Sequence, residues 1–243
     1  MRSLGRLLAL LLLCLLALQA GFALRIAAMN WIDPHSTSFQ RSEAARLLRE
    51  HGRIAWAQQW VPYVQISPHL KRAVIASEDA GFTEHSGVEW DAIEKALEKN
   101  QLAEARAEKA QARHPERPLA IKVVGGSTIT QQLAKNLFLS SERTVLRKGQ
   151  EFVLTLMLET LLSKQRILEI YLNHVEWGEG VFGAEAAAQH YYRKPASKLS
   201  AYEAPRLAVM LPRPKYFEKV PNSGYLSSRA GTIVARMGDA VLP

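Results

Sequence analysis

The feature that most constrains the fold of this chain is an uninterrupted apolar run near its N-terminus. Residues Leu7–Leu24 read LLALLLLCLLALQAGFAL, with one plainly polar side chain and no charged one. At a rise of about 1.5 Å per residue, a helix of this length spans roughly 27 Å, close to the thickness of the hydrocarbon core of a bilayer. Because the run is apolar on every face, we expect a membrane helix rather than the core helix of a soluble domain.

The charges around the run predict its orientation. Arg2 and Arg6 precede it and Arg25 follows it. Basic residues before a membrane helix favour a cytoplasmic N-terminus, so the rest of the chain is expected outside. A cleavable signal peptide would export the chain as well, but no clean A-x-A site closes the run after Ala17 and Ala20. We therefore expect an uncleaved anchor.

The composition narrows the function classes. The chain has 243 residues, 48% of them hydrophobic, and a formal net charge of +8. This length accommodates one domain plus an anchor. The positive charge attracts nucleic acid, anionic lipid head groups or phosphorylated substrates, and export makes nucleic acid a poor partner. Cys14 is the only cysteine, so the chain can form no internal disulfide and no cysteine-based zinc site.

Most of the chain after the anchor shows helical periodicity, so we expect a mainly α fold. Helices are predicted up to Gly52, over 70–81, over 91–115 with a charged and exposed surface, over 144–172 with a break near Ser163, and over 200–211 with Ser200 as the cap. The apolar stripe of the fourth segment includes Phe152 and Leu156. The predicted organisation is an anchor over 1–28, a connector over 29–66 and a main domain over 67–243.

Adjacent carboxylates form the first chemical cluster, SEDAGFTEHSG. Glu78 and Asp79 follow an apolar helix, and Glu84 and His85 come shortly after Phe82. Acid–base chemistry on sugars needs carboxylates whose environments push their pKa values apart, and an apolar wall beside two carboxylates is such an environment. Taken alone, the cluster is better explained by a surface Glu78 and an Asp79 that caps a loop.

The second cluster is GGSTITQQLAKN, which covers 125–136. Ser127 and Thr128 are predicted to cap a helix, and the N-terminus of that helix is a candidate anion site. Ser127, Gln131 and Lys135 are four residues apart and so share one helix face. Their hydroxyl, amide and ammonium groups suit sugar hydroxyls and a phosphate.

The third cluster is RTVLRKGQE, over 143–151. A helix aligns Arg143, Arg147 and Glu151, which are spaced by four residues. This pattern fits either a surface ion pair or a clamp for a diphosphate with a carboxylate nearby.

Together and in this order, the three clusters resemble the signature motifs ED-x-x-F-x-x-H-x-G, GGSTITQQ-x-x-KN and RK-x-x-E of glycosyltransferase family 51. KQRILEIYLN over 164–173 and WGEGVFGAEAAAQHYYRK over 177–194 also match, so the resemblance covers 67–221. It implies a lysozyme-like, mainly α domain with head and jaw lobes after one transmembrane helix. It also implies polymerisation of lipid II into β-1,4-linked glycan strands with release of undecaprenyl diphosphate. The expected location is the inner membrane, single-pass, with the catalytic domain on the periplasmic side.

The resemblance implies roles for individual residues. Glu78 matches the general base, Glu151 matches a second carboxylate that positions substrate or assists the leaving group, and Asp79 is given a structural role. The residues that match the diphosphate positions are Lys135, Arg143, Arg147 and Lys148. The residues that match the donor site are Ser127, Gln131, Gln132 and Asn136. The sequence does not exclude four nearby carboxylates as alternatives for these roles: Glu84, Glu169, Glu176 and Glu179.

The resemblance also implies partners. These are lipid II, the nascent glycan strand, inner-membrane lipids and proteins of cell-wall synthesis or division, with no nucleic acid. No cofactor is required and the sequence shows no metal cage, although Mg²⁺ or Mn²⁺ stimulates some members of the family.

Three rival functions differ in what they need. A nucleic-acid binder is poorly served by an exported domain, and the basic residues of this chain lack interleaved aromatic residues in a binding stripe. A glycan-cleaving enzyme of related fold needs no diphosphate clamp, and a non-catalytic scaffold of the wall machinery would not need Glu78, Glu151 and the polar row together. A transpeptidase domain is not expected, because neither S-x-x-K nor K-T-G occurs.

Overall fold

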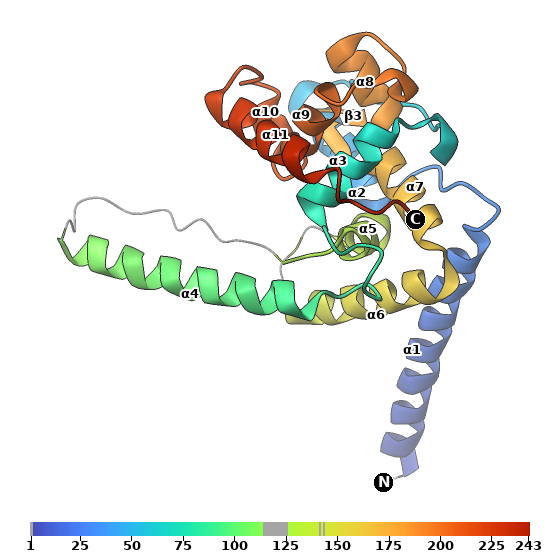
Figure 1. The fold of residues 1–243 in the computed structure, drawn as a ribbon. Helices are drawn as coiled ribbons and strands as arrows, with labels where there is room; N and C mark the ends of the chain where they lie inside the picture. Colours follow the sequence, from blue (N-terminus) through green and yellow to red (C-terminus); the bar gives the residue numbers. More distant parts are fainter. Residues whose placement is uncertain (1, 114–125, 141, 143) are drawn as a thin grey trace.

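The computed structural model describes residues 2–113, 126–140, 142 and 144–243 and is mainly α, as predicted (Figure 1). The elements in chain order, with η for a 3-10 helix, are α1 (Arg2–Ala28), α2 (Ser38–His51), β1 (Ala57–Gln58), η1 (Tyr63–Gln65), α3 (Pro68–Glu78), α4 (Trp90–Arg113), α5 (Ile129–Phe138), α6 (Val145–Leu161), α7 (Lys164–His174), β2 (Glu176–Gly178), β3 (Val181–Phe182), α8 (Ala184–Tyr192), η2 (Ala196–Lys198), α9 (Glu203–Met210), α10 (Pro214–Phe217) and α11 (Gly224–Arg236).

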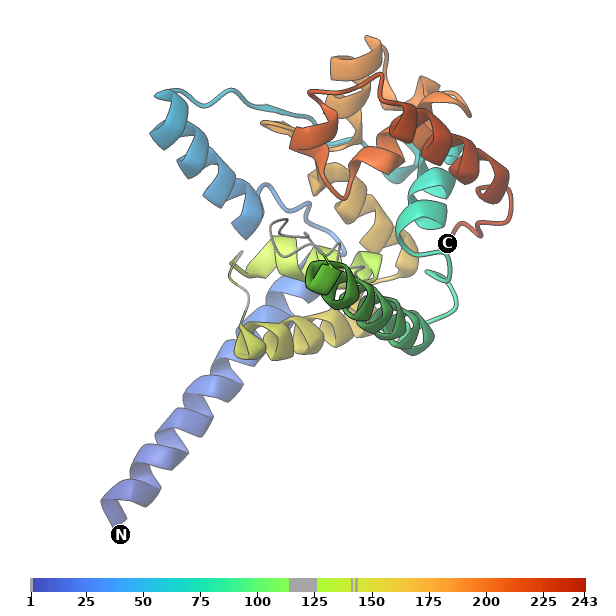
Figure 2. The same ribbon diagram turned by 90° about the vertical axis from the view of Figure 1, so that its left-hand side faces the viewer.

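Helix α1 is the only described helix that is long and apolar enough to cross a bilayer, over Ser3–Ala28. Figures 1 and 2 show that its N-terminal part projects away from the rest of the molecule. Its other end is joined to the body by hydrogen bonds. The side chains of Gln19 and Gln150 donate to each other over 2.9 and 3.1 Å, and Asn30 Nδ2 donates to the Leu161 carbonyl over 2.9 Å. Helix α1 is therefore fixed to α6.

The stretch predicted as a connector contributes helices and a strand to the folded unit. Thr37 and Gln40 form a capping box at the start of α2, and Gly52 ends that helix in a left-handed conformation, where the sequence predicted its end. Strand β1 pairs in parallel with β3, with Ala57 opposite Val181. The domain boundaries at 28 and 66 stay a prediction.

A single core lies under α3, α7 and α9, with α7 at its centre. Every residue of α7 from Ile170 to His174 is buried, and Trp177 of β2 is fully buried beside them. The small sheet has the order β1-β3-β2, and β2 runs antiparallel to β3. Helices α9 and α11 pack against α3, whose C-terminal end begins the first motif.

Local capping explains most helix ends. The side chain of Ser163 accepts a hydrogen bond from the backbone of Arg166, which separates α6 from α7 at the predicted break. Ser200 Oγ accepts from Glu203 N at the start of α9, as predicted. Helix α3 instead ends at Glu78, before the predicted Gly81, because Asp79 leaves the helical conformation with φ −164° and ψ 73°. Helix α4 is exposed and protrudes from the body (Figure 1), as its charges predicted.

Helix α6 carries apolar side chains on the outside of the molecule. Val145 and Leu146 are 90% and 88% exposed, and Phe152 and Leu156 of the predicted apolar stripe are exposed as well. The buried side of the helix consists of Glu151, Leu154, Thr155 and Leu158. The stripe at Phe152 and Leu156 thus faces away from the core, on the helix that packs against α1.

Candidate functional site

Glu78 is the last residue of α3, and its carboxylate is partly buried. Its Oε2 accepts a hydrogen bond from Gln132 Nε2 over 3.1 Å, and its Oε1 accepts one from Ser77 Oγ over 3.3 Å. Burial raises the pKa of Glu78 above its usual value, while the two hydrogen bonds act in the opposite direction. A carboxylate with a raised pKa that is still held by an amide donor is suited to accept a proton.

Asp79 joins the first motif to α5. Its Oδ2 accepts from the backbone N–H of Ile129 over 2.9 Å, and its Oδ1 lies 2.7 Å from His85 Nε2. The backbone N–H of Gly87 donates to His85 Nδ1 over 3.1 Å, so Nε2 carries the proton and donates to Asp79. These contacts agree with the structural role that the sequence analysis gave to Asp79.

One cluster in the described part of the chain has the composition of a metal site. The ligand atoms of Asp79, His85 and Glu89 lie within 4.8 Å of one another. However, both oxygens of Asp79 and both ring nitrogens of His85 already take part in hydrogen bonds within the protein. We therefore assign this cluster to structure rather than to metal binding.

The glycine of the first motif allows its loop to approach α6 closely. Gly87 has a φ of 89°, and a Cβ atom there would lie 2.7 Å from Thr155 Cγ2 and 2.8 Å from Glu159 Cγ. The carbonyl of Gly87 accepts a hydrogen bond from Thr128 Oγ1 over 2.7 Å. A larger residue would push this loop away from α6.

The N-terminus of α5 is occupied by the protein's own groups. Thr128 is the N-cap, and its side chain and that of Gln131 form a capping box. The next backbone N–H, that of Ile129, donates to Asp79. The prediction that this helix is capped by the Ser127–Thr128 pair is confirmed through Thr128. The prediction that its N-terminus is a ready anion site is wrong, because Asp79 and the capping box already use these donors.

A cavity of about 290 Å³ opens between α5 and α6. Most of its lining residues come from the second and third motifs, two come from the segment between these motifs and one comes from α2. They are Phe39, Ser127, Gln131, Gln132, Lys135, Asn136, Leu139, Ser140, Arg147, Lys148 and Glu151. All but one of the predicted substrate-binding residues therefore meet in one place. The exception, Arg143, lies outside the described residues. The individual roles of these residues stay a prediction.

Glu151 is 3% exposed and holds two cations at the cavity wall. Its Oε2 accepts from Arg147 Nη1 over 2.7 Å, and its Oε1 accepts from Lys148 Nζ over 2.5 Å. Because α6 places these residues three and four positions apart, one carboxylate can fix both side chains. Together, Glu151, Arg147 and Lys148 leave one net positive charge beside the cavity.

Gln132 connects the cavity to Glu78. It lines the cavity, and its amide nitrogen donates to the Glu78 carboxylate. Glu78 does not line the cavity itself, so this amide links the predicted base to the predicted substrate site.

The four alternative carboxylates do not line this cavity. Glu84 is exposed, and Glu169 is held by the backbone N–H of Tyr63 at 2.7 Å and by Arg166 at 2.6 Å. Glu176 and Glu179 belong to a separate charge network. Glu78 does not line the cavity either, but among these five carboxylates it is the one with a described hydrogen bond to a lining residue, Gln132, and we therefore favour it as the reactive carboxylate.

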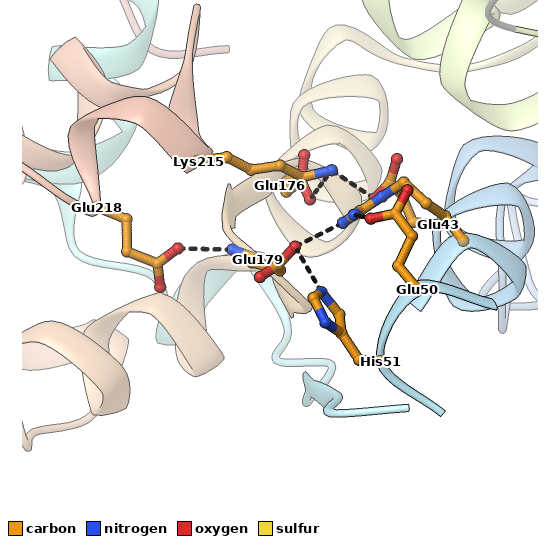
Figure 3. Close-up of polar contacts among 8 residues, drawn as sticks. Glu43, Glu50, His51, Glu176, Glu179, Lys215 and Glu218 are labelled. Carbon is orange, nitrogen blue, oxygen red and sulfur yellow. Dashed lines mark hydrogen bonds and ion pairs between the residues drawn. The ribbon is translucent and has the colours of Figure 1, made fainter. Parts of the chain in front are cut away.

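That network ties α2 to β2 and α10 (Figure 3). Arg46 of α2 contacts Glu43 and Glu179 over 2.8 Å each, and Lys215 of α10 contacts Glu43. Lys215 Nζ also lies 3.4 Å from Glu176 Oε1, an ion pair without hydrogen-bond geometry. Burial raises the pKa of Glu176 to about 7, and the charge of Lys215 acts against that shift.

Sequence reasoning missed three lining residues of the cavity, Phe39, Leu139 and Ser140, and of these Phe39 lies outside the segment that carries the second and third motifs. Phe39 comes from α2, belongs to none of the motifs and lies far from them in the chain. The network of Figure 3 holds its helix in place. No sequence signal identified Phe39, since its contact with the cavity depends on how α2 packs against α5.

Comparison with known proteins now identifies the family. The model of the family described as "Transglycosylase" matches residues 46–238, most of the chain. This chain belongs to the transglycosylase family. The biosynthetic peptidoglycan transglycosylase of Burkholderia thailandensis is 56% identical over 228 residues, which cover 94% of this chain and 83% of the relative. The protein of the same name from Paraburkholderia xenovorans is 53% identical (94% and 88% covered), and that from Bordetella pertussis is 54% identical (87% and 82% covered).

The transglycosylase match starts within α2 and so includes most of the charge network as well as the three motifs. The family region therefore takes in Glu78 and the whole cavity apart from Phe39.

Proposed function

We propose that this transglycosylase polymerises lipid II into β-1,4-linked glycan strands of peptidoglycan and releases undecaprenyl diphosphate. The observation that carries the proposal is the link from Glu78 through Gln132 to a cavity lined by cations. The family, and relatives named for peptidoglycan biosynthesis, support a glycosyltransferase of cell-wall synthesis rather than a scaffold or a glycan-cleaving enzyme.

In the proposed reaction, Glu78 accepts the proton of the 4-hydroxyl group of the acceptor sugar. The freed oxygen attacks the anomeric carbon of the growing strand on the face opposite to the leaving group. The bond between that carbon and the diphosphate oxygen breaks, and its electron pair leaves with the diphosphate. The raised pKa of Glu78 makes it a stronger base than an ordinary glutamate.

Negative charge grows on the diphosphate as its bond breaks. Lys135, Arg147 and Lys148 line the cavity and are the cations that we assign to this charge, together with Arg143. Fixed cations of this kind stabilise the transition state more than the ground state. Both oxygens of Glu151 are engaged with Arg147 and Lys148, so we assign Glu151 to positioning these cations.

The sugars of the donor strand meet the polar part of the same wall. Ser127 and Asn136 offer hydroxyl and amide groups to sugar hydroxyls. Gln132 lines the same wall, but its amide already bonds Glu78 and Tyr171, so only its second N–H and the second lone pair of its oxygen are left for a sugar. Gln131 lines the cavity too, but its Oε1 is used by the capping box, so only the remaining part of its amide is left for a sugar.

The protein is a membrane-associated enzyme, and we assign it to the inner membrane with one span and a periplasmic catalytic domain. Helix α1 supplies the span, and the arginines before it favour a cytoplasmic N-terminus. The exposed apolar side chains of α6 lie on a helix that packs against α1, so both meet lipid. A substrate with a lipid tail then reaches the cavity from the bilayer.

We assign no required cofactor to the reaction. Mg²⁺ or Mn²⁺ would stimulate it by binding the diphosphate of the substrate, so a chelator should slow polymerisation without stopping it. Proteins of cell-wall synthesis or division are the proposed protein partners, and co-purification from membranes after cross-linking tests them.

The test is polymerisation of labelled lipid II by the full chain in detergent. Glu78→Gln keeps the shape of the side chain and removes the base, so we expect a loss of roughly 10²–10⁴-fold. Glu84→Gln is the matched control, because Glu84 is an exposed carboxylate of the same motif and should be dispensable.

Two results would contradict the proposal. Full activity in a folded Glu78→Gln variant would remove Glu78 as the base. Cleavage of preformed glycan by the wild type, with no polymer formed from lipid II, would favour a lytic enzyme.

A further inference from the structure

Tyr171 of α7 places a hydroxyl group inside the core. The side chain is 1% exposed, and its hydroxyl donates to Gln132 Oε1 over 3.0 Å. A phenylalanine would fill the same volume without needing a partner, so a buried tyrosine requires a matching acceptor. Here the acceptor is the amide oxygen of Gln132, and the amide nitrogen of the same residue donates to Glu78.

The amide of Gln132 has two different ends, and each has its own partner. Its oxygen accepts from Tyr171 and its nitrogen donates to Glu78 over 3.1 Å. A half-turn of the amide would point its oxygen at the Glu78 carboxylate, where two acceptors repel each other. The donor hydroxyl of Tyr171 favours the orientation that is seen.

We propose that Tyr171 is a positioning residue for the reaction, because its hydroxyl fixes the Gln132 amide so that the N–H group donates to Glu78. This inference rests on the proposed function, in which Glu78 accepts the proton of the acceptor sugar. Tyr171 does not line the cavity, and it acts on Glu78 through Gln132.

Tyr171 keeps its proton in the pH range in which the enzyme works. Burial raises its pKa well above the usual value, and the nearby charges of Glu78 and Asp79 raise it further. Its hydroxyl is therefore a constant donor while Glu78 changes its protonation state.

Four neighbouring groups act on the pKa of Glu78, two through their charge and two through hydrogen bonds. Asp79, the next residue, raises the pKa of Glu78 through its negative charge, and Arg229 of α11 lowers it. Ser77 and Gln132 donate hydrogen bonds that favour the ionised form. Of these groups, the Gln132 donor is the one whose orientation Tyr171 controls.

The proposal makes a prediction about pH dependence. In Tyr171→Phe the amide loses its fixed orientation, donates less well, and stabilises the ionised Glu78 less. The pKa of Glu78 then rises, and since only ionised Glu78 accepts the proton, the acid limb of kcat/KM moves to higher pH. We expect a shift of roughly half a unit to one unit, with much of the activity retained above the shifted limb.

The experiment measures kcat/KM for lipid II polymerisation against pH, using the full chain in detergent. Tyr191→Phe is the matched control. It removes a tyrosine hydroxyl that donates to the Trp177 carbonyl over 2.8 Å, a contact that does not involve Glu78 or Gln132, so its acid limb should stay in place. In a Gln132→Ala background, Tyr171→Phe should cause no further shift, because the two residues act in series.

A second variant guards against misfolding of Tyr171→Phe. Fluorotyrosine at position 171 keeps both the ring and the O–H group, so it should retain the acid limb of the wild type. A shifted limb in that variant would overturn the proposal.

Three further outcomes would also overturn it: an unshifted acid limb in Tyr171→Phe, an equal loss of activity at every pH, or an additional shift in the Gln132→Ala background. Wild-type polymerisation and an inactive Glu78→Gln variant, measured alongside, keep the proposed function separate. If the wild type does not polymerise lipid II, or if Glu78→Gln stays active, the proposed function is wrong and the proposed role of Tyr171 is wrong as well.

Discussion

The two carboxylates of the site differ in their surroundings at the scale of single residues. Glu78 is held by one amide and one hydroxyl, whereas Glu151 is held by two cations. Burial of Glu78 without a direct cation raises its pKa, which suits a proton acceptor. Glu151 instead brings two positive side chains to the same wall of the cavity.

A prediction at this scale concerns Lys135. Removal of its charge in Lys135→Ala should lower kcat/KM by roughly 10²-fold, because a charge that stabilises the leaving diphosphate is lost. The acid limb of the pH profile should not move, since Glu78 and its hydrogen bonds are unchanged. Lipid II polymerisation at several pH values measures both effects.

Lys194→Ala is the control for this prediction. Lys194 pairs with Glu203 at 2.7 Å, on residues that do not line the cavity. Equal losses in the two variants would show that the general positive charge of the protein, rather than Lys135 at the cavity, supports the reaction.

At the scale of elements, the anchor and α6 form one unit. Helix α1 packs along α6, and the amides of Gln19 and Gln150 form two hydrogen bonds between them. Phe22 of α1 also makes an edge contact with Phe138 of α5, with ring centroids 5.4 Å apart. The end of the anchor is therefore in contact with both helices that line the cavity.

The amide pair should contribute measurably to stability. In an apolar environment such a pair is worth about 0.6 to 1.7 kcal/mol. Gln19→Leu and Gln150→Leu should each lower the unfolding free energy in micelles by about this amount. The double variant should lose no more than either single variant, since one contact is removed in each case. Additive losses in the double variant would show that the two amides do not act as a pair.

The apolar outer side of α6 should bind lipid. Leu146→Glu places a charge where an 88% exposed leucine stands, so a chain lacking residues 1–28 should float less with anionic vesicles. Tyr202→Glu is the control, because Tyr202 is 77% exposed and directly precedes α9, at the end of the molecule away from α1 (Figure 1). Equal flotation of both variants would argue against contact between α6 and lipid.

The element scale also shows what the sequence could predict. Helix ends at Gly52, Ser163 and Thr128 depend on local caps, and these were predicted. The contacts of Phe39 and Asp79 with α5 and its cavity join residues that are far apart in the chain, and periodicity carries no information about them.

Apolar periodicity also does not distinguish a core from a bilayer. The stripe through Phe152 and Leu156 was visible in the sequence, but only the structure shows that it faces outward. The convergence of the second and third motifs was easier to predict, since consecutive helices usually pack against each other and both motifs carry groups suited to one substrate.

At the scale of the whole molecule, the network of Figure 3 joins segments more than a hundred residues apart. It fixes α2, the source of Phe39, to β2 and α10. Its one strongly buried member is Glu176, whose carboxylate lies near Lys215 but also near the like charge of Glu43.

The raised pKa of Glu176 predicts that the free energy of unfolding depends on pH. The pKa of Glu176 is about 7 in the folded protein against 4.5 for the ordinary side chain, so the folded state binds the proton more tightly. Its contribution to stability is present below pH 4.5 and is lost as the pH rises to about 7. Glu176→Gln should therefore be more stable than the wild type at about pH 8, by on the order of 3 kcal/mol, and similar to it at about pH 4. Denaturant unfolding at both pH values measures the difference.

Glu50→Gln serves as the control, because Glu50 belongs to the same network but its side chain is 51% exposed. Its difference from the wild type should change little with pH. A wild type that gains stability over Glu176→Gln as the pH rises would mean that attraction to Lys215 outweighs the cost of burial.

The position of Asp79 bears on the design of inhibitors. A compact monoanion that would bind a helix N-terminus finds the one on α5 already taken by this carboxylate. The cations that line the cavity come from two helices, Lys135 from α5 and Arg147 and Lys148 from α6. An effective inhibitor therefore has to spread its negative charge over a length that reaches both helices, and extended polyanionic scaffolds should be selected over small phosphate mimics.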